Sequence, residues 1–226
     1  MFTRWRVTSA NHLLLPVLVL CGLITSCAPT LVPKPLVAKP VTGPSVKAQK
    51  PEWKVGYWWE YAWKRPGGSG TATEEVIRES TFEGVPCYVI KRGQKEYFYT
   101  KAVLGYIASM SRGRLRRKLT PPRQRLFWPL EVGKEWRNTY LQEKPLKKSS
   151  RRIDRRLVVA SLEEVKVPAG TFKAFRIERY NYGTLIEEFW YSPKVKWIVK
   201  SRTYLRDGAR EDVELIDYKI THSSVW

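Results

Sequence analysis

The stretch that most constrains the fold lies between residues 165 and 202, where three turn sequences recur roughly ten residues apart. Between the first two turns, Phe175 and Ile177 alternate with polar side chains. Such alternation is typical of a β-strand with one buried face. Strands joined by turns this short run antiparallel, so the stretch predicts a meander. The turns are Pro168-Ala169-Gly170, Asn181-Tyr182-Gly183 and Ser192-Pro193-Lys194.

The same alternation extends to both sides of this stretch. Between residues 55 and 107, no apolar pattern of helical period persists for three turns. We therefore predict an all-β fold, a single antiparallel meander of about ten strands curled into a barrel or half-barrel. Further strands are expected at residues 55–63, 71–80, 85–91, 96–101, 104–107, 136–141, 152–161 and 211–220.

The first residues have the features of an export signal. Arg4 and Arg6 precede an apolar run over residues 13–23, too short to span a bilayer, and small residues lead to Cys27. Residues 24–27 resemble the bacterial lipobox. This resemblance implies that Cys27 is acylated and attaches the protein to a lipid bilayer. Ala28 at the next position implies the outer membrane, facing the periplasm. An ordinary cleaved signal peptide and an uncleaved anchor remain alternatives.

Residues 28–51 contain six prolines, several lysines and few large side chains. Such a segment buries too little apolar surface to fold, and proline favours an extended conformation. We expect a lipoprotein signal peptide at residues 1–26, a lipidated cysteine and proline-rich linker at 27–51, and a β-rich periplasmic domain at 52–226.

Cysteine and histidine are too scarce for several kinds of site. Cys87 would be the single cysteine of the domain, so no disulfide can form within it. We expect Cys87 to be a small buried core residue. His12 belongs to the signal and His222 to the last five residues, which leaves no imidazole for a catalytic triad or a zinc site. We therefore predict no catalytic residue, no metal and no cofactor.

Positive charge is concentrated in two segments. The chain has a net charge of +20, and residues 112–125 hold seven basic residues without an acid. Residues 144–156 hold seven more against one aspartate. A field of this kind attracts anionic surfaces, although a solvated arginine-rich loop would look the same. The candidate contact residues are Arg112, Arg114, Arg116, Arg117, Lys118, Lys147, Lys148, Arg151, Arg152, Arg155 and Arg156.

In an exported protein the expected partners of these residues are anionic lipids, lipopolysaccharide, acidic glycans or other envelope proteins. The compartment argues against nucleic acid.

Residues 125–219 resemble the TapB-like family of exported β-rich domains. The resemblance rests on F-W-P-L-x-V-G-K-x-W, V-P-A-G-T-F-K-A-F-R-I, W-Y-S-P and E-L-I-D-Y. It implies a β-rich fold and no catalytic residue. More distantly, a lipid-anchored curled sheet is similar to lipoprotein-carrier half-barrels, whose concave face holds acyl chains. The aromatic faces of residues 55–63 and 184–191 fit either a filled core or an open apolar cavity.

Glycan hydrolysis would require two carboxylates in one cleft. Adjacent glutamates on a strand point to opposite faces, so each such pair offers at most one inward member, with Glu187 or Glu188 the better candidate. Solvated charge is the simpler explanation. We therefore predict a non-enzymatic envelope lipoprotein that binds or scaffolds, with a lipid carrier and a carboxylate-dependent glycan hydrolase as alternatives. The pairs are Glu74-Glu75, Glu163-Glu164 and Glu187-Glu188.

Overall fold

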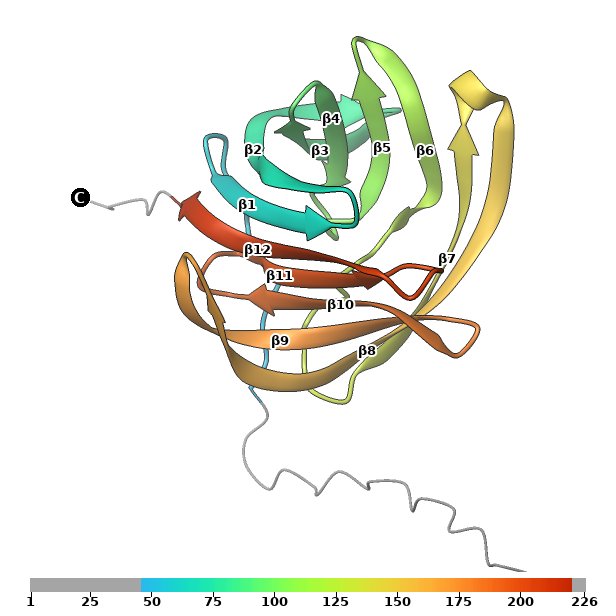
Figure 1. The fold of residues 1–226 in the computed structure, drawn as a ribbon. Helices are drawn as coiled ribbons and strands as arrows, with labels where there is room; N and C mark the ends of the chain where they lie inside the picture. The colour runs from blue at the N-terminus through green and yellow to red at the C-terminus, as the bar shows by residue number, and fades with distance from the viewer. Residues whose placement is uncertain (1–45, 221–226) are drawn as a thin grey trace, which may run out of the picture. The chain divides into compact units, whose positions relative to one another are not determined.

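The computed structural model describes residues 46–220, which fold into one closed antiparallel β-barrel (Figure 1). Each strand pairs with the next along the chain, and the last strand returns to pair with the first. The predicted all-β meander is confirmed, with twelve strands in this part of the chain. They are β1 Trp58–Arg65, β2 Gly68–Phe82, β3 Val85–Arg92, β4 Lys95–Thr100, β5 Tyr106–Ser111, β6 Arg114–Arg123, β7 Glu135–Lys144, β8 Ser149–Val167, β9 Gly170–Asn181, β10 Thr184–Ser192, β11 Trp197–Tyr204 and β12 Arg210–Lys219, with a short 3-10 helix η1 at Pro145–Lys147.

Tight turns join many of the strands. In the β2–β3 turn, Glu83 and Gly84 both have positive φ values, of 48° and 80°. Tyr182 and Gly183 in the β9–β10 turn repeat this pattern, with 47° and 82°. Two consecutive residues of positive φ match the right-handed twist of the flanking strands, and glycine adopts this conformation without steric cost. These turns account for the antiparallel neighbours read from the sequence.

One strand lies inside a segment that we had read as a basic surface. Strand β6 pairs with β5 over most of its length but with β7 at three positions, Lys118 to Thr120. A register shift between the Ser109–Arg117 and Met110–Leu115 pairs inserts an extra residue into β6. A bulge of this kind reverses which side chains face inward, so the alternation that marks a strand is broken within the segment.

The main core fills one end of the barrel, where the chain before β1 enters. Trp53 is 1% exposed, and its ring centroid lies 4.8 Å from that of Trp197 and 5.8 Å from that of Trp59. Its indole nitrogen donates a hydrogen bond to the carbonyl of Lys196. Ala48 pairs with Leu130 through two backbone hydrogen bonds of 2.8 and 2.9 Å. The residues before β1 therefore close this end of the barrel.

The contacts of Ala48 also bear on the linker. We placed the boundary between linker and domain after residue 51, and that boundary stays a prediction. In the structure, the segment that begins at residue 48 packs on the domain, and its Trp53 side chain is buried in the core. The signal peptide, Cys27 and linker residues 28–45 lie outside the described residues.

A second, smaller core lies on the outer face of β2 to β6. It contains Cys87 and Val89, both 0% exposed, together with Phe98 of β4. Lys118 of β6 donates a 2.9 Å hydrogen bond to Glu83 in the β2–β3 turn, so these strands curl over the cluster. The prediction that Cys87 is a buried core residue is confirmed. No helix among residues 46–220 is long and apolar enough to cross a membrane.

Candidate functional site

The inward faces of successive strands change from aromatic to charged toward the same end of the barrel. On β1 the series runs from the fully buried Trp59 through Tyr61 to Arg65, whose side chain is 57% exposed. On β3 it runs from Tyr88 to Arg92, which is 49% exposed. Since neighbouring strands alternate in direction, the charged positions meet at one end. That end, opposite the one closed by Trp53, is open to solvent.

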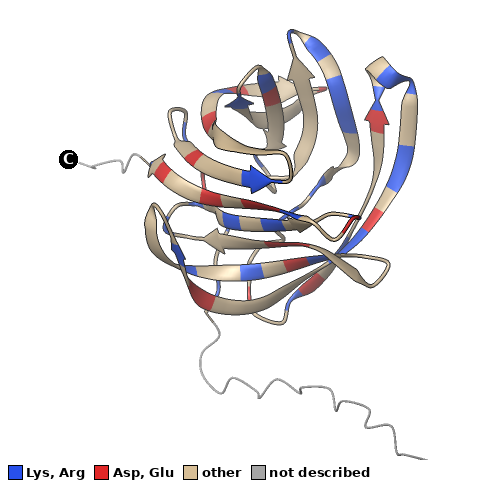
Figure 2. Ribbon diagram, in the orientation of Figure 1, with Lys and Arg blue, Asp and Glu red and all other residues tan. Residues whose placement is uncertain are grey.

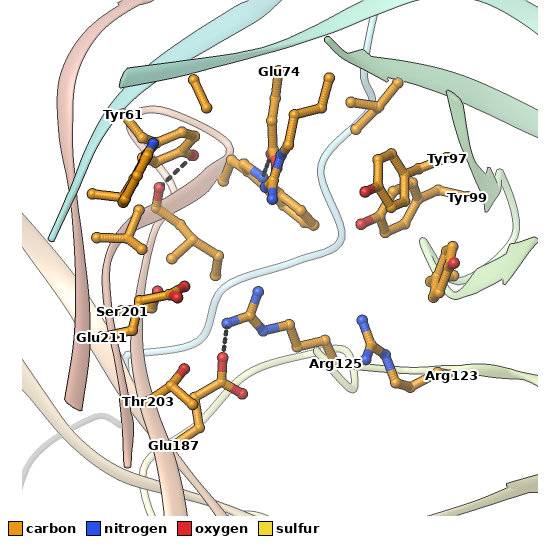
Figure 3. A pocket seen from close by; sticks show the side chains of 18 of the residues that line it. Tyr61, Glu74, Tyr97, Tyr99, Arg123, Arg125, Glu187, Ser201, Thr203 and Glu211 are labelled. Carbon is orange, nitrogen blue, oxygen red and sulfur yellow. Dashed lines mark hydrogen bonds and ion pairs between the residues drawn. The ribbon is translucent and has the colours of Figure 1, made fainter. Parts of the chain in front are cut away.

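A cavity of about 490 Å³ occupies this open end (Figure 3). Its size falls in the range of small-molecule sites, about 300–1,000 Å³, but its lining is more charged than is usual. The charged and phenolic side chains that line it are Arg65, Arg92, Arg117, Arg123, Arg125, Glu74, Glu187, Glu211, Tyr61, Tyr97, Tyr99 and Tyr106.

Glu187 of β10 organises one wall of the cavity. Its side chain is 9% exposed, and Oε1 accepts a 2.5 Å hydrogen bond from Nη2 of Arg125. Oε2 lies 2.8 Å from Nη2 of Arg179 on β9, an ion pair that is not aligned as a hydrogen bond. The guanidinium of Arg125 also stacks 4.2 Å from the ring centre of Phe189. Burial lowers the pKa of Arg179, and Glu187 opposes this effect while Arg125 adds to it.

The other two glutamates of the cavity are also paired. Glu74 of β2 forms an ion pair with Arg92, and its Oε2 accepts a 2.8 Å hydrogen bond from the indole nitrogen of Trp197. Glu211 lies 3.7 Å from Arg65 at the opening. Each cavity carboxylate is therefore bound to an arginine.

Two cavity arginines remain without a carboxylate. Among residues 46–220, neither Arg117 nor Arg123 lies within ion-pair distance of an acid. Nε of Arg123 is buried without a hydrogen-bond partner, and its guanidinium lies 5.2 Å from the ring centre of Tyr106. The hydroxyl of Tyr106, a residue only 3% exposed, lies near Ser109 but makes no aligned hydrogen bond with any residue of the range 46–220. Buried polar groups without partners are uncommon, and they are expected where a ligand supplies the missing contacts.

Three of the cavity tyrosines keep their hydroxyl hydrogen at neutral pH and can donate hydrogen bonds. Burial raises the pKa of Tyr61, Tyr99 and Tyr106 above the ordinary phenol value. The hydroxyl of Tyr61 donates a 2.8 Å hydrogen bond to the carbonyl of Ile198. Ser109 lies close enough to Tyr106 to oppose the effect of burial on its pKa, but within residues 46–220 no aligned hydrogen bond uses the Tyr106 hydroxyl.

The two basic segments of the sequence become neighbouring hairpins beside the cavity. Figure 2 shows Lys and Arg along β6 and along β8 near the tip of the β7–β8 hairpin. Residues of β6 contact η1 at that tip. We call the positively charged side chains of this region, apart from the cavity-lining Arg117, the basic rim. It consists of Arg114, Arg116, Lys144, Lys147, Lys148, Arg151 and Arg152, and within residues 46–220 none of them forms an ion pair.

The protonation of Lys144 records the crowding of positive charge at the basic rim. Partial burial lowers its pKa, and the charges of Arg117, Arg151 and Lys147 lower it further. These cations come from β6, η1 and β8, so their fields overlap around one lysine. Arg117 both lines the cavity and contributes to this field. Arg117 therefore connects the basic rim to the cavity.

The predicted contact residues divide into two groups. Six remain exposed and unpaired as rim residues, namely Arg114, Arg116, Lys147, Lys148, Arg151 and Arg152. The other five line the cavity or bind a polar side chain of the protein itself. Arg117 lines the cavity, Arg112 binds Gln94, Lys118 binds Glu83, Arg155 binds Asn181 and Arg156 binds Glu135. That the exposed group contacts an anionic partner stays a prediction.

The adjacent glutamates also separate as expected. Glu187 faces the cavity, whereas Glu188 lies on the outer face, where it binds Arg176 and the hydroxyl of Tyr204. Glu74 is a second inward carboxylate. The glycan hydrolase alternative requires a carboxyl group that is free to donate a proton, whereas each of the three cavity carboxylates, Glu74, Glu187 and Glu211, forms an ion pair with an arginine.

Three functional residues escaped the sequence reasoning. The sequence places Arg123 and Arg125 only in a basic segment and does not single out Arg179, which continues the inward alternation of Phe175 and Ile177. A bulge between the β8 positions paired with Ile177 and Arg176, and another between the β10 positions paired with Tyr180 and Arg179, alter the phase of side chains there. One signal in the sequence is a charged residue at the end of an aromatic strand face. The face formed by Trp59, Tyr61 and Trp63, for example, ends at Arg65. Among residues 46–220, no group of three His, Cys, Asp or Glu side chains could hold a metal ion.

Comparison with known proteins finds similar solved structures but no matching family. No family model matches the chain and no curated protein is similar to it, so the TapB-like resemblance stays a prediction. A candidate exported protein with a YmcC-like fold from Bacteroides fragilis is 14% identical, with a TM-score of 0.43 over 76% of this chain and 100% of that chain. A candidate lipoprotein from Parabacteroides distasonis is 12% identical, with a TM-score of 0.41 over 76% and 99%.

The hypothetical lipoprotein YmcC of Escherichia coli is 10% identical, with a TM-score of 0.36 over 73% of this chain and 86% of that chain. The first of the three is described as an exported protein and the other two as lipoproteins. These descriptions name no ligand and no reaction.

Proposed function

We propose that this protein is a non-enzymatic envelope lipoprotein that uses the basic rim to bind an anionic surface. The observation that supports this most directly is the meeting of two basic hairpins, distant in sequence, with seven cations that are unpaired within residues 46–220. Surface charges gain little from isolated partners, but several together attract an anionic layer at about 1 kcal/mol per residue. The partner we favour is a surface of phosphate-bearing lipids, including lipopolysaccharide.

The membrane attachment belongs to the same proposal. Acylation at Cys27 would fasten the chain to the outer membrane, and the proline-rich linker would let the barrel reach a nearby anionic surface. The geometry supports the alternative of an apolar carrier less well, because arginine, glutamate and tyrosine line the observed cavity. An acyl chain in this cavity would remove water from Arg117 and Arg123 without giving either of them a partner.

The attachment is tested by labelling cells with palmitate and separating their membranes. The wild-type protein should carry the label and sediment with the outer membrane. Cys27→Ser should carry no label and appear in the soluble periplasmic fraction. Sedimentation of unlabelled Cys27→Ser with membranes would contradict acylation as the anchor.

The basic rim is tested by neutralising two of its arginines. Arg114→Gln combined with Arg152→Gln should weaken binding to anionic vesicles by about 2 kcal/mol, or roughly 30-fold, at low salt. The matched control, Lys166→Gln combined with Lys173→Gln, removes the same charge from exposed positions at the opposite end and should bind as the wild type does. Equal loss in both variants would indicate that net charge, and not the basic rim, determines binding. Preference for an acidic glycan over vesicles would reassign the partner.

A further inference from the structure

Among residues 46–220, the side chains that line the cavity carry more positive than negative charge. Five arginines and three glutamates line it, and the glutamates pair with Arg92, Arg65 and Arg125. Arg117 and Arg123 are the two guanidinium groups left over. Placing two like charges in a partly buried site is unfavourable unless an anion joins them. The site is thus suited to a ligand that brings close to two negative charges.

The hydrogen-bond donors that remain free in the cavity limit which kind of anion it can bind. A guanidinium presents paired N–H groups that match the oxygens of phosphate or carboxylate. In the part of the chain that the structure describes, the buried Nε of Arg123 has no acceptor, and the hydroxyl of Tyr106, although close to Ser109, makes no aligned hydrogen bond. A phosphomonoester carries about −1.5 to −2 charges at pH 7 and three acceptor oxygens, whereas a carboxylate carries one charge and two oxygens. Charge and donor number therefore favour the phosphomonoester.

Aromatic rings on the same wall indicate what the phosphate is attached to. The ring centre of Tyr106 lies 5.8 Å from that of Tyr97 and 5.7 Å from that of Tyr99. Figure 3 shows the Tyr97 and Tyr99 side chains on the same side of the cavity as Arg123. Tyrosines grouped in this way can pack against the face of a flat ring or of a sugar. A volume near 490 Å³ accommodates a phosphate and one or two such rings.

We propose that the barrel cavity binds a phosphomonoester carried on a sugar or flat ring, with Arg123 and Arg117 on the phosphate and Tyr97, Tyr99 and Tyr106 beside the ring. The site would add recognition of a single phosphorylated group to the diffuse attraction of the basic rim. It does not depend on that attraction, because Arg123 lies within the barrel and is no rim residue. The phosphomonoester could be a free compound or the headgroup of a lipid.

The test uses phenyl phosphate as the probe and isothermal titration calorimetry on the full-length protein. Wild-type protein should bind phenyl phosphate more tightly than inorganic phosphate, which lacks the ring, and more tightly than benzoate, which lacks the second charge. Arg123→Gln should weaken the binding of phenyl phosphate by about tenfold or more, since a hydrogen bond to a charged group is lost. Arg123→Lys keeps the charge without the paired donors. It should bind phenyl phosphate more weakly than the wild type and more tightly than Arg123→Gln.

Arg114→Gln provides the matched control, because it removes one arginine from the exposed part of the same strand. It should leave phenyl phosphate binding unchanged while weakening attachment to anionic vesicles, so the cavity and the basic rim are tested separately. Thermal melts should show that Arg123→Gln is folded, since the change relieves an uncompensated charge. Failure of the folded wild type to bind phenyl phosphate, or equal binding by Arg123→Gln, would overturn the proposal.

Competition distinguishes the two sources of the phosphate. Vesicles containing phosphatidic acid, a lipid phosphomonoester, should displace phenyl phosphate if the natural ligand is a lipid headgroup. Vesicles of phosphatidylglycerol, a phosphodiester, with the lipid fraction adjusted to give the same surface charge, serve as the comparison. Displacement by phosphatidic acid alone supports a lipid headgroup. Displacement by neither supports a free phosphomonoester, and equal displacement by both contradicts selection by the cavity.

Discussion

Replacing Trp53 with alanine is expected to lower the free energy of unfolding by about 3–5 kcal/mol. The indole is 1% exposed and contacts Trp59, Tyr88, Tyr99 and Trp197, so its removal leaves a large cavity at the closed end of the barrel. The hydrogen bond to the carbonyl of Lys196 is lost as well. A decrease of this size would lower the melting temperature by on the order of 10 °C.

The control for this change is Val55→Ala, two residues along the same segment. Val55 is 53% exposed, and substitutions at such positions usually alter stability by less than about 0.5 kcal/mol. Chemical denaturation followed by tryptophan fluorescence measures both variants. If Trp53→Ala were as stable as Val55→Ala, the segment before β1 would not be part of the cooperative fold.

Replacing Glu187 with leucine is expected to destabilise the protein by about 3 kcal/mol, because the change leaves two largely buried arginines without their counterion. Arg125 and Arg179 are 25% and 21% exposed, and Arg123 adds a third charge nearby. Burial and the neighbouring arginines already lower the pKa of Arg179, and Glu187 is the group that opposes them. Without Glu187, the repulsion among these arginines is no longer offset by its carboxylate.

Denaturation of Glu187→Leu at low salt measures this effect, with Glu75→Leu as the control on the solvent face of β2. Added inorganic phosphate should raise the melting temperature of Glu187→Leu more than that of the wild type, because ligand binding to the native state adds to its stability. A Glu187→Leu variant as stable as the control would show that the ion pairs contribute no net stability.

Glu187 also separates two kinds of arginine in the barrel. Arg125 is held by a carboxylate and by the ring of Phe189, which fixes its position, whereas Arg123 packs on Tyr106 and, within residues 46–220, forms no ion pair. The paired arginines shape the cavity, and the unpaired ones are available to a ligand. The basic rim continues this positive potential outward and can steer an anion toward the opening.

Much of the fold was readable from local patterns. The alternation of Phe175 and Ile177 with polar residues and the turn at Tyr182-Gly183 predicted antiparallel strands, because period-two burial and positive φ are properties of short segments. The same holds for Cys87 as an apolar core residue. The strand β6 was missed because its bulge interrupts the alternation at Arg116 and Arg117.

By itself, the sequence determined the all-β meander, the two basic segments and the predicted export of the chain, since each depends on neighbouring residues alone. Only the tertiary structure decided that β12 closes onto β1 and that Trp53 fills one end of the barrel. It also decided that Arg123 lies inside while Arg114 of the same strand lies outside. Closure and register arise from contacts between residues far apart in the chain, and a shift of one position exchanges inside for outside.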